Sequence, residues 1–263
     1  MIPYDRSDRA CSWTHVRHEG LSAIAEYLRS CATVDEVSIR VGHVARELGF
    51  TFHALVHHAD LTRPPPSFIF LQNYPADWVQ AYAQGGLHRF DPTQRLAAAR
   101  PASFAWEDLG GVTPLAPNEM RVLEAARKAG LGEGFTVPLN APGERAASCS
   151  FACEAGAALP VEALPLAEFA AHIAWGALFD LLHPDRVTAV MRLTPRQLEC
   201  VELMAQGKTD WEIGKIVGLT RSSVTTYLQS ARRRIGVARR TQLAMSAASF
   251  GLIGFEEIRP VNI

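Results

Sequence analysis

Aromatic side chains and a carboxylate concentrate between residues 74 and 106 of this 263-residue chain. The aromatic members are Tyr74, Trp78, Tyr82, Phe90, Phe104 and Trp106. Asp91 lies among them and is followed by Pro92. Core packing is the alternative for any one ring taken singly, and a helix N-cap is the alternative for Asp91, although both of its roles can hold at once. Since ligand sites are mostly apolar with a few fixed polar groups, the segment predicts a small-molecule pocket.

A second group of polar and basic residues lies in the segment 221–235. Val224, Leu228, Ala231 and Ile235 recur at helical spacing and predict one buried stripe. The residues that face away from this stripe are Ser222, Thr225, Gln229, Arg232 and Arg233. Short polar side chains reach base edges and arginines meet phosphates, so this surface predicts a helix that reads a DNA groove. The alternative is an amphipathic helix with a solvated basic face.

Start and stop signals divide residues 193–250 into four short helices. Each of the first three begins at a capping residue, namely Thr194 followed by Pro195, then Thr209 or Asp210, then Thr220. The apolar side of the second helix is expected to consist of Ile213, Ile216 and Val217. Gly218 makes a tight turn, Gly236 ends the third helix, and Thr241–Phe250 is the fourth. Two short helices joined by such a turn, the second rich in arginine, indicate a helix-turn-helix.

The distribution of charge sets this C-terminal segment apart from the rest. The net charge of the whole chain is only −1. Residues 191–263 contain 11 Lys and Arg against 6 Asp and Glu, whereas residues 1–190 contain 15 against 21. A basic C-terminal segment that follows an acidic N-terminal segment indicates a module that binds a polyanion, attached to a domain with a different function.

The preceding residues alternate between helix and strand patterns. Helices are expected at 33–48, 75–84, 118–130 and 161–182, and strands at 50–58, 68–71, 135–139 and 146–153. Turn residues at 141–144 join the last two strands into a hairpin. The helix at 161–182 is apolar on nearly every side, so it is buried on both faces or packs against a second subunit. This order of elements indicates an α+β domain in which helices cover one sheet.

Composition excludes several classes of protein. Hydrophobic residues make up 48% of the chain and charged residues 20%, which is typical of globular proteins and excludes global disorder. No apolar run approaches the roughly 20 residues of a membrane span, and Met1–Ala10 lacks the apolar core of a secretory signal. The five scattered cysteines fit free thiols in a reducing compartment and complete no zinc set. We therefore expect a cytoplasmic protein without a metal or cofactor.

An enzyme is the competing functional class. His57 and His58 with Asp91 could suggest a proton relay, but neighbouring residues of a strand point to opposite faces. The sequence contains no Gly-x-Ser-x-Gly elbow, Gly-rich phosphate loop or His-Glu-x-x-His helix. A phosphorylated receiver domain is also disfavoured, because no acidic cluster follows the first strand. We expect a regulator and not an enzyme.

Three stretches of the C-terminal segment closely resemble the LuxR-type helix-turn-helix. They are Leu193–Glu199, Ala205–Ile213 and Ser223–Leu228. The sequence departs from the family at Gly214, where Ala is usual, and at Tyr227, where His is frequent; the small Gly214 still permits close helix packing. The resemblance implies that Thr225 and Gln229 read bases and that the fourth helix dimerises. Residues implied in phosphate contact are Lys208, Thr209, Arg232 and Arg234.

The central segment resembles the acyl-homoserine-lactone-binding domain of quorum-sensing LuxR-type regulators. Matching stretches are Tyr74–Trp78, Tyr82, Asp91-Pro92, Phe104–Trp106, Gly130–Gly134 and Val137–Leu139. The resemblance implies that the Trp78 indole donates to the lactone carbonyl and that Asp91 accepts the amide N–H. Tyr74 and Ser150 offer hydroxyls to the amide or 3-oxo carbonyls, Trp106 and Tyr82 form flat walls, and Thr93 is a further pocket residue. Gly134 is expected to meet a backbone requirement.

The combined expectation is a dimeric, ligand-responsive transcription factor. Residues 1–19 would form an extension, 20–183 an α/β/α sandwich with a central antiparallel sheet, 184–192 a linker, and 193–263 an all-α four-helix helix-turn-helix domain. Its expected partners are an N-acyl-homoserine lactone, double-stranded promoter DNA, a second copy of the chain and RNA polymerase, with no membrane. The rival interpretation is a LuxR-type regulator that answers a non-lactone signal or acts without a ligand.

Overall fold

The computed structural model describes residues 18–65, 68–141, 144–183 and 193–254. The chain divides into two compact units: residues up to 140 with 145–182, here called the N-terminal unit, and residues from 183 onward with 141–144, here called the C-terminal unit. The expected linker 184–192 and residues 1–17 of the expected extension lie outside the described residues.

The N-terminal unit contains a five-stranded antiparallel sheet with the order β2-β1-β5-β4-β3. The strands are β1 (Phe52–His57), β2 (Phe70–Gln72), β3 (Phe104–Ala105), β4 (Leu131–Pro138) and β5 (Ala147–Glu154). β4 and β5 pair as the expected hairpin. The two-residue strand β3 is an addition that the sequence pattern did not predict, because so short a segment has no periodicity.

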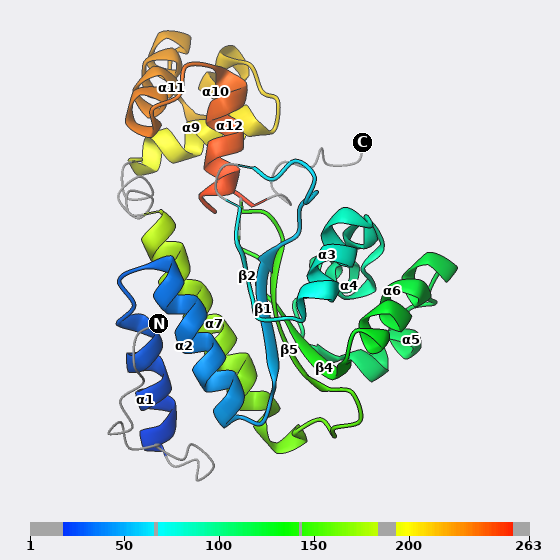
Figure 1. Cartoon of the computed structure of the whole chain (residues 1–263). Helices are drawn as coiled ribbons and strands as arrows, with labels where there is room; N and C mark the ends of the chain where they lie inside the picture. The colour runs from blue at the N-terminus through cyan, green and yellow to red at the C-terminus, as the bar shows by residue number, and fades with distance from the viewer. Residues whose placement is uncertain (1–17, 66–67, 142–143, 184–192, 255–263) are drawn as a thin grey trace. The chain divides into compact units, whose positions relative to one another are not determined.

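Helices cover both faces of this sheet, which confirms the predicted α/β/α sandwich (Figure 1). One layer contains α1 (His18–Arg29), α2 (Val34–Glu47) and α7 (Leu164–Leu182). The other contains α3 (Ala76–Gln84), α4 (Pro92–Ala99), α5 (Leu109–Val112) and α6 (Pro117–Lys128). Short 3-10 turns η1 (Leu87–Phe90), η2 (Trp106–Asp108) and η3 (Val161–Ala163) connect these elements.

Side chains of β5 alternate between the two layers, as a strand requires. Cys149 and Phe151 are fully buried in the main core, which includes residues of α1, α2 and α7. Ser148 and Ser150 therefore point to the opposite face, toward the second helical layer. The long helix α7 contributes its small and apolar residues to the main core: Leu166, Ala167, Ala170, Ala171, Ala174, Trp175 and Leu178.

A buried histidine makes this core sensitive to acid. His53 is 4% exposed, and burial lowers its pKa to about 4, with the positive charge of Arg46 acting in the same direction. The unfolded chain binds a proton below about pH 6.5, whereas folded His53 resists it until about pH 4. The free energy of unfolding is therefore expected to fall by up to about 3 kcal/mol between these pH values.

Urea denaturation of wild type and His53→Gln at pH 7, 5.5 and 4.5 tests this prediction. The variant is expected to lose less stability than wild type on acidification. A remaining pH slope is expected from the partly buried His58, whose pKa is also about 4. An identical pH slope for the two proteins would contradict it.

Within residues 193–254, the C-terminal unit contains four helices, as predicted: α9 (Pro195–Ala205), α10 (Asp210–Val217), α11 (Arg221–Ile235) and α12 (Arg240–Ser249). The side chains of Thr194, Thr209 and Thr220 accept the predicted N-cap hydrogen bonds. Gly218 and Gly236 adopt left-handed conformations with φ of 71° and 81° at the ends of α10 and α11. Glycine is favoured at both helix ends because it has no Cβ to strain.

The apolar face of α10 differs from the prediction at one residue. Ile213 is fully buried, but Ile216 is 57% exposed. Helix α10 packs instead through Ile213 and Gly214, and a Cβ on Gly214 would lie 2.6 Å from the carbonyl oxygen of Leu219. The small residue thus permits the close packing of α10 against the turn, and Ile216 lies beyond the packed face.

Among the described residues, no helix has the length and apolarity needed to span a bilayer. The same residues contain no group of three or more side chains that could hold a metal ion. Four cysteines are described, and all have buried free thiols.

Candidate ligand pocket and nucleic-acid interface

A cavity lies between the sheet and the layer formed by α3, α4 and α6. It encloses about 660 Å³ of space that protein atoms do not occupy, part of it open to solvent. Its lining includes all seven residues predicted from the sequence to contact a ligand: Tyr74, Trp78, Tyr82, Asp91, Thr93, Trp106 and Ser150. A mostly apolar lining with a few polar groups is typical of small-molecule sites. Four separate segments of the chain thus bring the predicted residues together.

Two of the six aromatic residues in the central segment have other roles. Phe90 is 46% exposed, and Phe104 packs in a separate cluster with Leu96 and Leu109. Trp78 and Tyr82 lie one turn apart on α3, with ring centroids separated by 5.2 Å, and each is 6% exposed. They pack in a small core cluster and line the cavity at the same time, so the packing and ligand interpretations are compatible.

Asp91 is the N-cap of α4 and also faces the cavity. Its Oδ1 accepts hydrogen bonds from the Thr93 backbone N–H at 2.8 Å and from the Thr93 hydroxyl at 2.6 Å. Its Oδ2 accepts one from the Tyr82 hydroxyl at 2.5 Å. A carboxylate has about four acceptor positions, so Oδ2 retains capacity for one further donor. The cap holds the carboxylate in place while leaving that position available.

The indole N–H of Trp78 complements this acceptor. Trp78 lines the cavity, and the structure shows no partner for its N–H among the residues that it describes. A buried indole N–H normally finds a hydrogen-bond acceptor. The cavity therefore offers a donor on α3 and an acceptor at the start of α4.

A series of hydrogen bonds links Trp106 to Thr136 on β4 and Ser150 on β5. The Trp106 indole donates to the Thr136 hydroxyl at 2.8 Å, which lies 2.9 Å from the Ser150 hydroxyl. Ser150 and Tyr74 both line the cavity. Burial raises the pKa of Tyr74 well above its usual value, as does the nearby Asp91, so its hydroxyl stays protonated. Sequence reasoning missed Thr136, which the strand register places directly opposite Ser150.

The role of Gly134 differs from the expected backbone requirement. A Cβ at this position would lie 2.5 Å from the Trp106 ring. Gly134 therefore provides the space in which the indole rests against β4, and its role concerns the packing of a side chain.

Gly134→Ala is consequently expected to displace the Trp106 ring and break its hydrogen bond to Thr136. Such overpacking costs about 1–3 kcal/mol, which thermal melting can detect. Gly110→Ala is the matched control, because a Cβ there would meet nothing within 4 Å. Equal melting temperatures for the two variants would contradict the assigned role.

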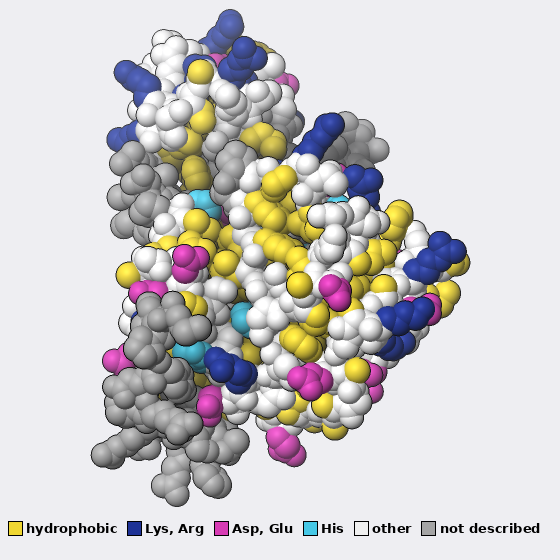
Figure 2. Space-filling view, viewed as in Figure 1, with side chains coloured by type: hydrophobic (Ala, Val, Ile, Leu, Met, Phe, Trp, Pro, Cys, Tyr) yellow, Lys and Arg dark blue, Asp and Glu magenta, His cyan; other side chains and the backbone are white. Residues whose placement is uncertain are grey.

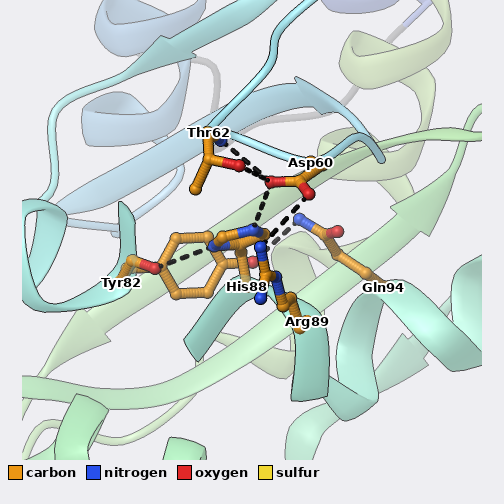
Figure 3. A network of polar contacts seen from close by, with 6 residues as sticks. All are labelled: Asp60, Thr62, Tyr82, His88, Arg89 and Gln94. Carbon is orange, nitrogen blue, oxygen red and sulfur yellow. Dashed lines mark hydrogen bonds and ion pairs between the residues drawn. The ribbon is translucent and has the colours of Figure 1, made fainter. Parts of the chain in front are cut away.

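A polar network links Tyr82 to His88 and Asp60 (Figure 3). His88, buried on η1, lies 3.2 Å from the Tyr82 carbonyl oxygen through Nδ1 and 3.2 Å from Asp60 Oδ1 through Nε2. Asp60 also accepts hydrogen bonds from Thr62, which lower its pKa below the usual value. The network ties the segment after β1 to the end of α3. Gln94, a cavity residue that sequence reasoning missed, donates to the Tyr82 hydroxyl at 2.8 Å.

In the C-terminal unit, α11 presents the predicted polar face. Val224, Leu228 and Ala231 are buried, whereas Ser222, Gln229 and Arg233 are exposed. Figure 2 shows Lys and Arg side chains projecting from this unit. Asp210 at the start of α10 accepts a hydrogen bond from Thr225 at 2.8 Å, so the preceding Lys208 and Thr209 lie close to the middle of α11. Six of the eight predicted DNA contacts thus lie on α11, and Lys208 and Thr209 lie in the segment that leads into α10.

Three of the predicted DNA contacts are less well placed to meet DNA. The side chains of Thr225 and Arg232 are hydrogen-bonded within the protein, and Arg234 lies on a different side of α11. The Thr225 hydroxyl donates to Asp210, which is also paired with Arg240 at 2.5 Å. Arg232 donates to the Ala238 carbonyl at 3.1 Å. Arg234 lies roughly 120° around the helix from Ser222, because successive residues are about 100° apart. Gln229 and Arg233 therefore lie most directly on the exposed polar face.

Comparison with known proteins matches two segments of the chain to family profiles. The sequence profile described as "Autoinducer binding domain" matches residues 33–178, and the profile described as "Bacterial regulatory proteins, luxR family" matches residues 191–247. The first match alone covers more than half of the chain.

Individual relatives and structures resemble the chain over most of its length. The quorum sensing-dependent transcriptional regulator RpaR of Rhodopseudomonas palustris is 30% identical over 78% of this chain and 83% of RpaR. VjbR of Brucella abortus is 29% identical over 78% of each chain. The crystal structure of Escherichia coli SdiA has a TM-score of 0.65 at 24% identity, covers 89% of this chain and 98% of SdiA, and shows the shared fold. The chain is thus a transcriptional regulator and not an enzyme, and it belongs to the quorum-sensing LuxR family, in which an autoinducer-binding domain precedes a LuxR-type helix-turn-helix.

Proposed function

We propose that this regulator binds an N-acyl-homoserine lactone in the N-terminal cavity and, as a homodimer, binds promoter DNA. The observation that carries the proposal is the pairing of an available indole donor with a carboxylate that has one acceptor position left. An acyl-homoserine lactone offers the complementary groups, a ring carbonyl and an amide N–H, on one small head group.

The lactone carbonyl, the amide N–H and the amide carbonyl would each have a counterpart in the cavity. Trp78 would donate to the lactone carbonyl and Asp91 Oδ2 would accept the amide N–H, a charge-assisted bond worth about 1.5–3 kcal/mol. Tyr74 and Ser150 would donate to the amide carbonyl. Trp106, Tyr82 and Thr93 would enclose the head group. The apolar lining, which includes Val56 and Phe70, would bind the acyl chain at about 0.8 kcal/mol per buried CH₂.

Occupancy of the cavity would then govern the DNA-binding unit. A ligand that binds only the folded state stabilises it by mass action. A two-fold dimer would present two copies of α11 to a two-fold operator, with α12 as the dimer helix. Such a regulator would act in the cytoplasm, where the promoter and RNA polymerase are found.

Thermal melting of the full chain with and without lactone tests the proposal. At a lactone concentration of 100 Kd, the expected stabilisation of about 2.7 kcal/mol corresponds to a rise in Tm of roughly 5–10 °C. The ring-opened N-acyl-homoserine is the matched control and is expected to give a smaller shift. No shift with any lactone at saturation would contradict the proposal.

A non-lactone ligand is the second candidate. SdiA has also been solved in complex with octanoyl-rac-glycerol, with a TM-score of 0.64 to this chain. An acyl glycerol supplies a carbonyl, an acyl chain and two hydroxyl donors, but no amide N–H. The same melting series with octanoyl-rac-glycerol compares the candidates directly, and a larger rise in Tm with octanoyl-rac-glycerol than with any lactone would favour the non-lactone ligand.

A further inference from the structure

A second polar position lines the cavity away from the proposed head-group site. Ser148 of β5 belongs to the lining, and its hydroxyl lies 2.9 Å from Nε2 of His58. Ser148 is 2% exposed, and His58 is partly buried. None of the contacts proposed above for the lactone head group uses it.

The strand register separates this position from the head-group site. Ser150 lies opposite Ala54 of β1, and Ser148 lies opposite Val56, so the two serines occupy successive rows on the same face of the sheet. Two residues along a strand span about 7 Å. A lactone amide held at Ser150 would therefore direct its acyl chain, and not its head group, past Ser148.

His58 lies partly buried beside Ser148 in a neutral form. Burial lowers the pKa of His58 to about 4. Its Nδ1 is buried without a hydrogen-bond partner, so Ser148 is the contact that orients the ring. A neutral imidazole has one donor and one acceptor nitrogen, and whichever role Nε2 takes leaves Ser148 able to play the other role toward the cavity. The pair can therefore accept from or donate to a ligand atom.

The apolar surroundings of Ser148 make its hydroxyl able to discriminate between acyl chains with and without an oxygen atom. Val56 and Phe70 flank it in the same row, with Val56 paired to both, so the wall is otherwise apolar. A plain alkyl chain would cover the remaining hydrogen-bonding capacity of Ser148 without replacing it, which carries a desolvation cost. A chain with an oxygen atom at this point avoids the cost.

We propose that Ser148, positioned by His58, binds a hydroxyl or carbonyl oxygen on the acyl group, several carbons beyond the amide. This inference rests on the proposed lactone-binding function and specifies its ligand class. His58 acts through Ser148 and is a positioning residue.

Isothermal titration calorimetry of the full chain with three lactones of equal chain length tests the proposal. N-octanoyl-homoserine lactone has no oxygen on its chain beyond the amide. N-(7-oxooctanoyl)-homoserine lactone and N-(6-hydroxyoctanoyl)-homoserine lactone each have one, at different positions. Wild type is expected to bind at least one oxygenated probe tenfold or more tightly than the octanoyl probe. Ser148→Ala should remove that preference and leave octanoyl binding equal or stronger.

Further variants distinguish a loss of the preference for oxygenated acyl chains from a loss of folded protein. His58→Gln should reduce the preference while retaining octanoyl binding, whereas Ser150→Ala, the matched control one row away, should weaken all lactones alike. Melting temperatures confirm that each variant is folded. A wild type that prefers the octanoyl probe, or Ser148→Ala weakening all probes equally, overturns this proposal alone. Failure of wild type to bind any lactone overturns the proposed function as well.

Discussion

Replacement of Asp91 by alanine is expected to lower the affinity for an acyl-homoserine lactone by roughly a hundredfold. The variant loses the acceptor for the ligand amide N–H, a bond worth up to about 3 kcal/mol, and each 1.4 kcal/mol corresponds to a tenfold change. It also frees the Tyr82 hydroxyl that Asp91 holds at 2.5 Å. Titration calorimetry measures the affinity, and the lactone-induced rise in Tm should shrink accordingly.

Asp91→Asn separates binding from capping. Asparagine is as good an N-cap as aspartate, so α4 should keep the stability of about 1 kcal/mol that alanine loses. Its amide, however, lacks the second carboxylate oxygen that would receive the ligand N–H. The expected result is near-native melting without ligand and weak lactone binding. Native lactone affinity in both variants would show that Asp91 is only a helix cap and would contradict its role as the acceptor of the ligand amide N–H.

Gln229→Ala is expected to produce the largest effect on DNA binding. A side chain that pairs with a base edge contributes about 1–3 kcal/mol of discrimination, and a dimer that contacts two half-sites would lose this twice. Gln229 is exposed on the polar face of α11, and its loss should spare the buried stripe of Val224 and Leu228. Specific binding should fall while binding to unrelated DNA is retained.

Arg233→Ala should act differently from Gln229→Ala. An arginine that meets phosphate weakens binding to all sequences and reduces the slope of log K against log salt by about one per contact. Fluorescence anisotropy at several salt concentrations distinguishes the two effects. Lys128→Gln on α6 of the N-terminal unit is the control of equal charge change, and it should leave both quantities unaltered. Uniform weakening by Gln229→Ala with an unchanged specificity ratio would contradict base reading.

Local signals predicted much of this fold correctly. The capping threonines, the helix-ending glycines and the β4–β5 hairpin all depend on residues close in sequence, which is why their positions could be anticipated. Trp78 and Tyr82 were predicted as pocket residues because aromatic residues concentrate in their segment and because this segment resembles the acyl-homoserine-lactone-binding domain.

The errors and omissions involve contacts between distant segments. Thr136 supports Trp106 and Ser150 because strand register brings β4 and β5 together, and no local pattern specifies that register. The space that Gly134 leaves for Trp106 and the exposure of Ile216 likewise depend on how elements pack. His58 was considered for catalysis, whereas its contact with Ser148 arises across two strands.

A crystal structure of the full chain saturated with an acyl-homoserine lactone tests the central claim most directly. The account predicts the lactone inside the cavity, with its amide nitrogen within hydrogen-bonding distance of Asp91 Oδ2 and its ring carbonyl within reach of the Trp78 indole. An empty cavity under these conditions, with Trp78 and Asp91 contacting only protein atoms, would contradict the account.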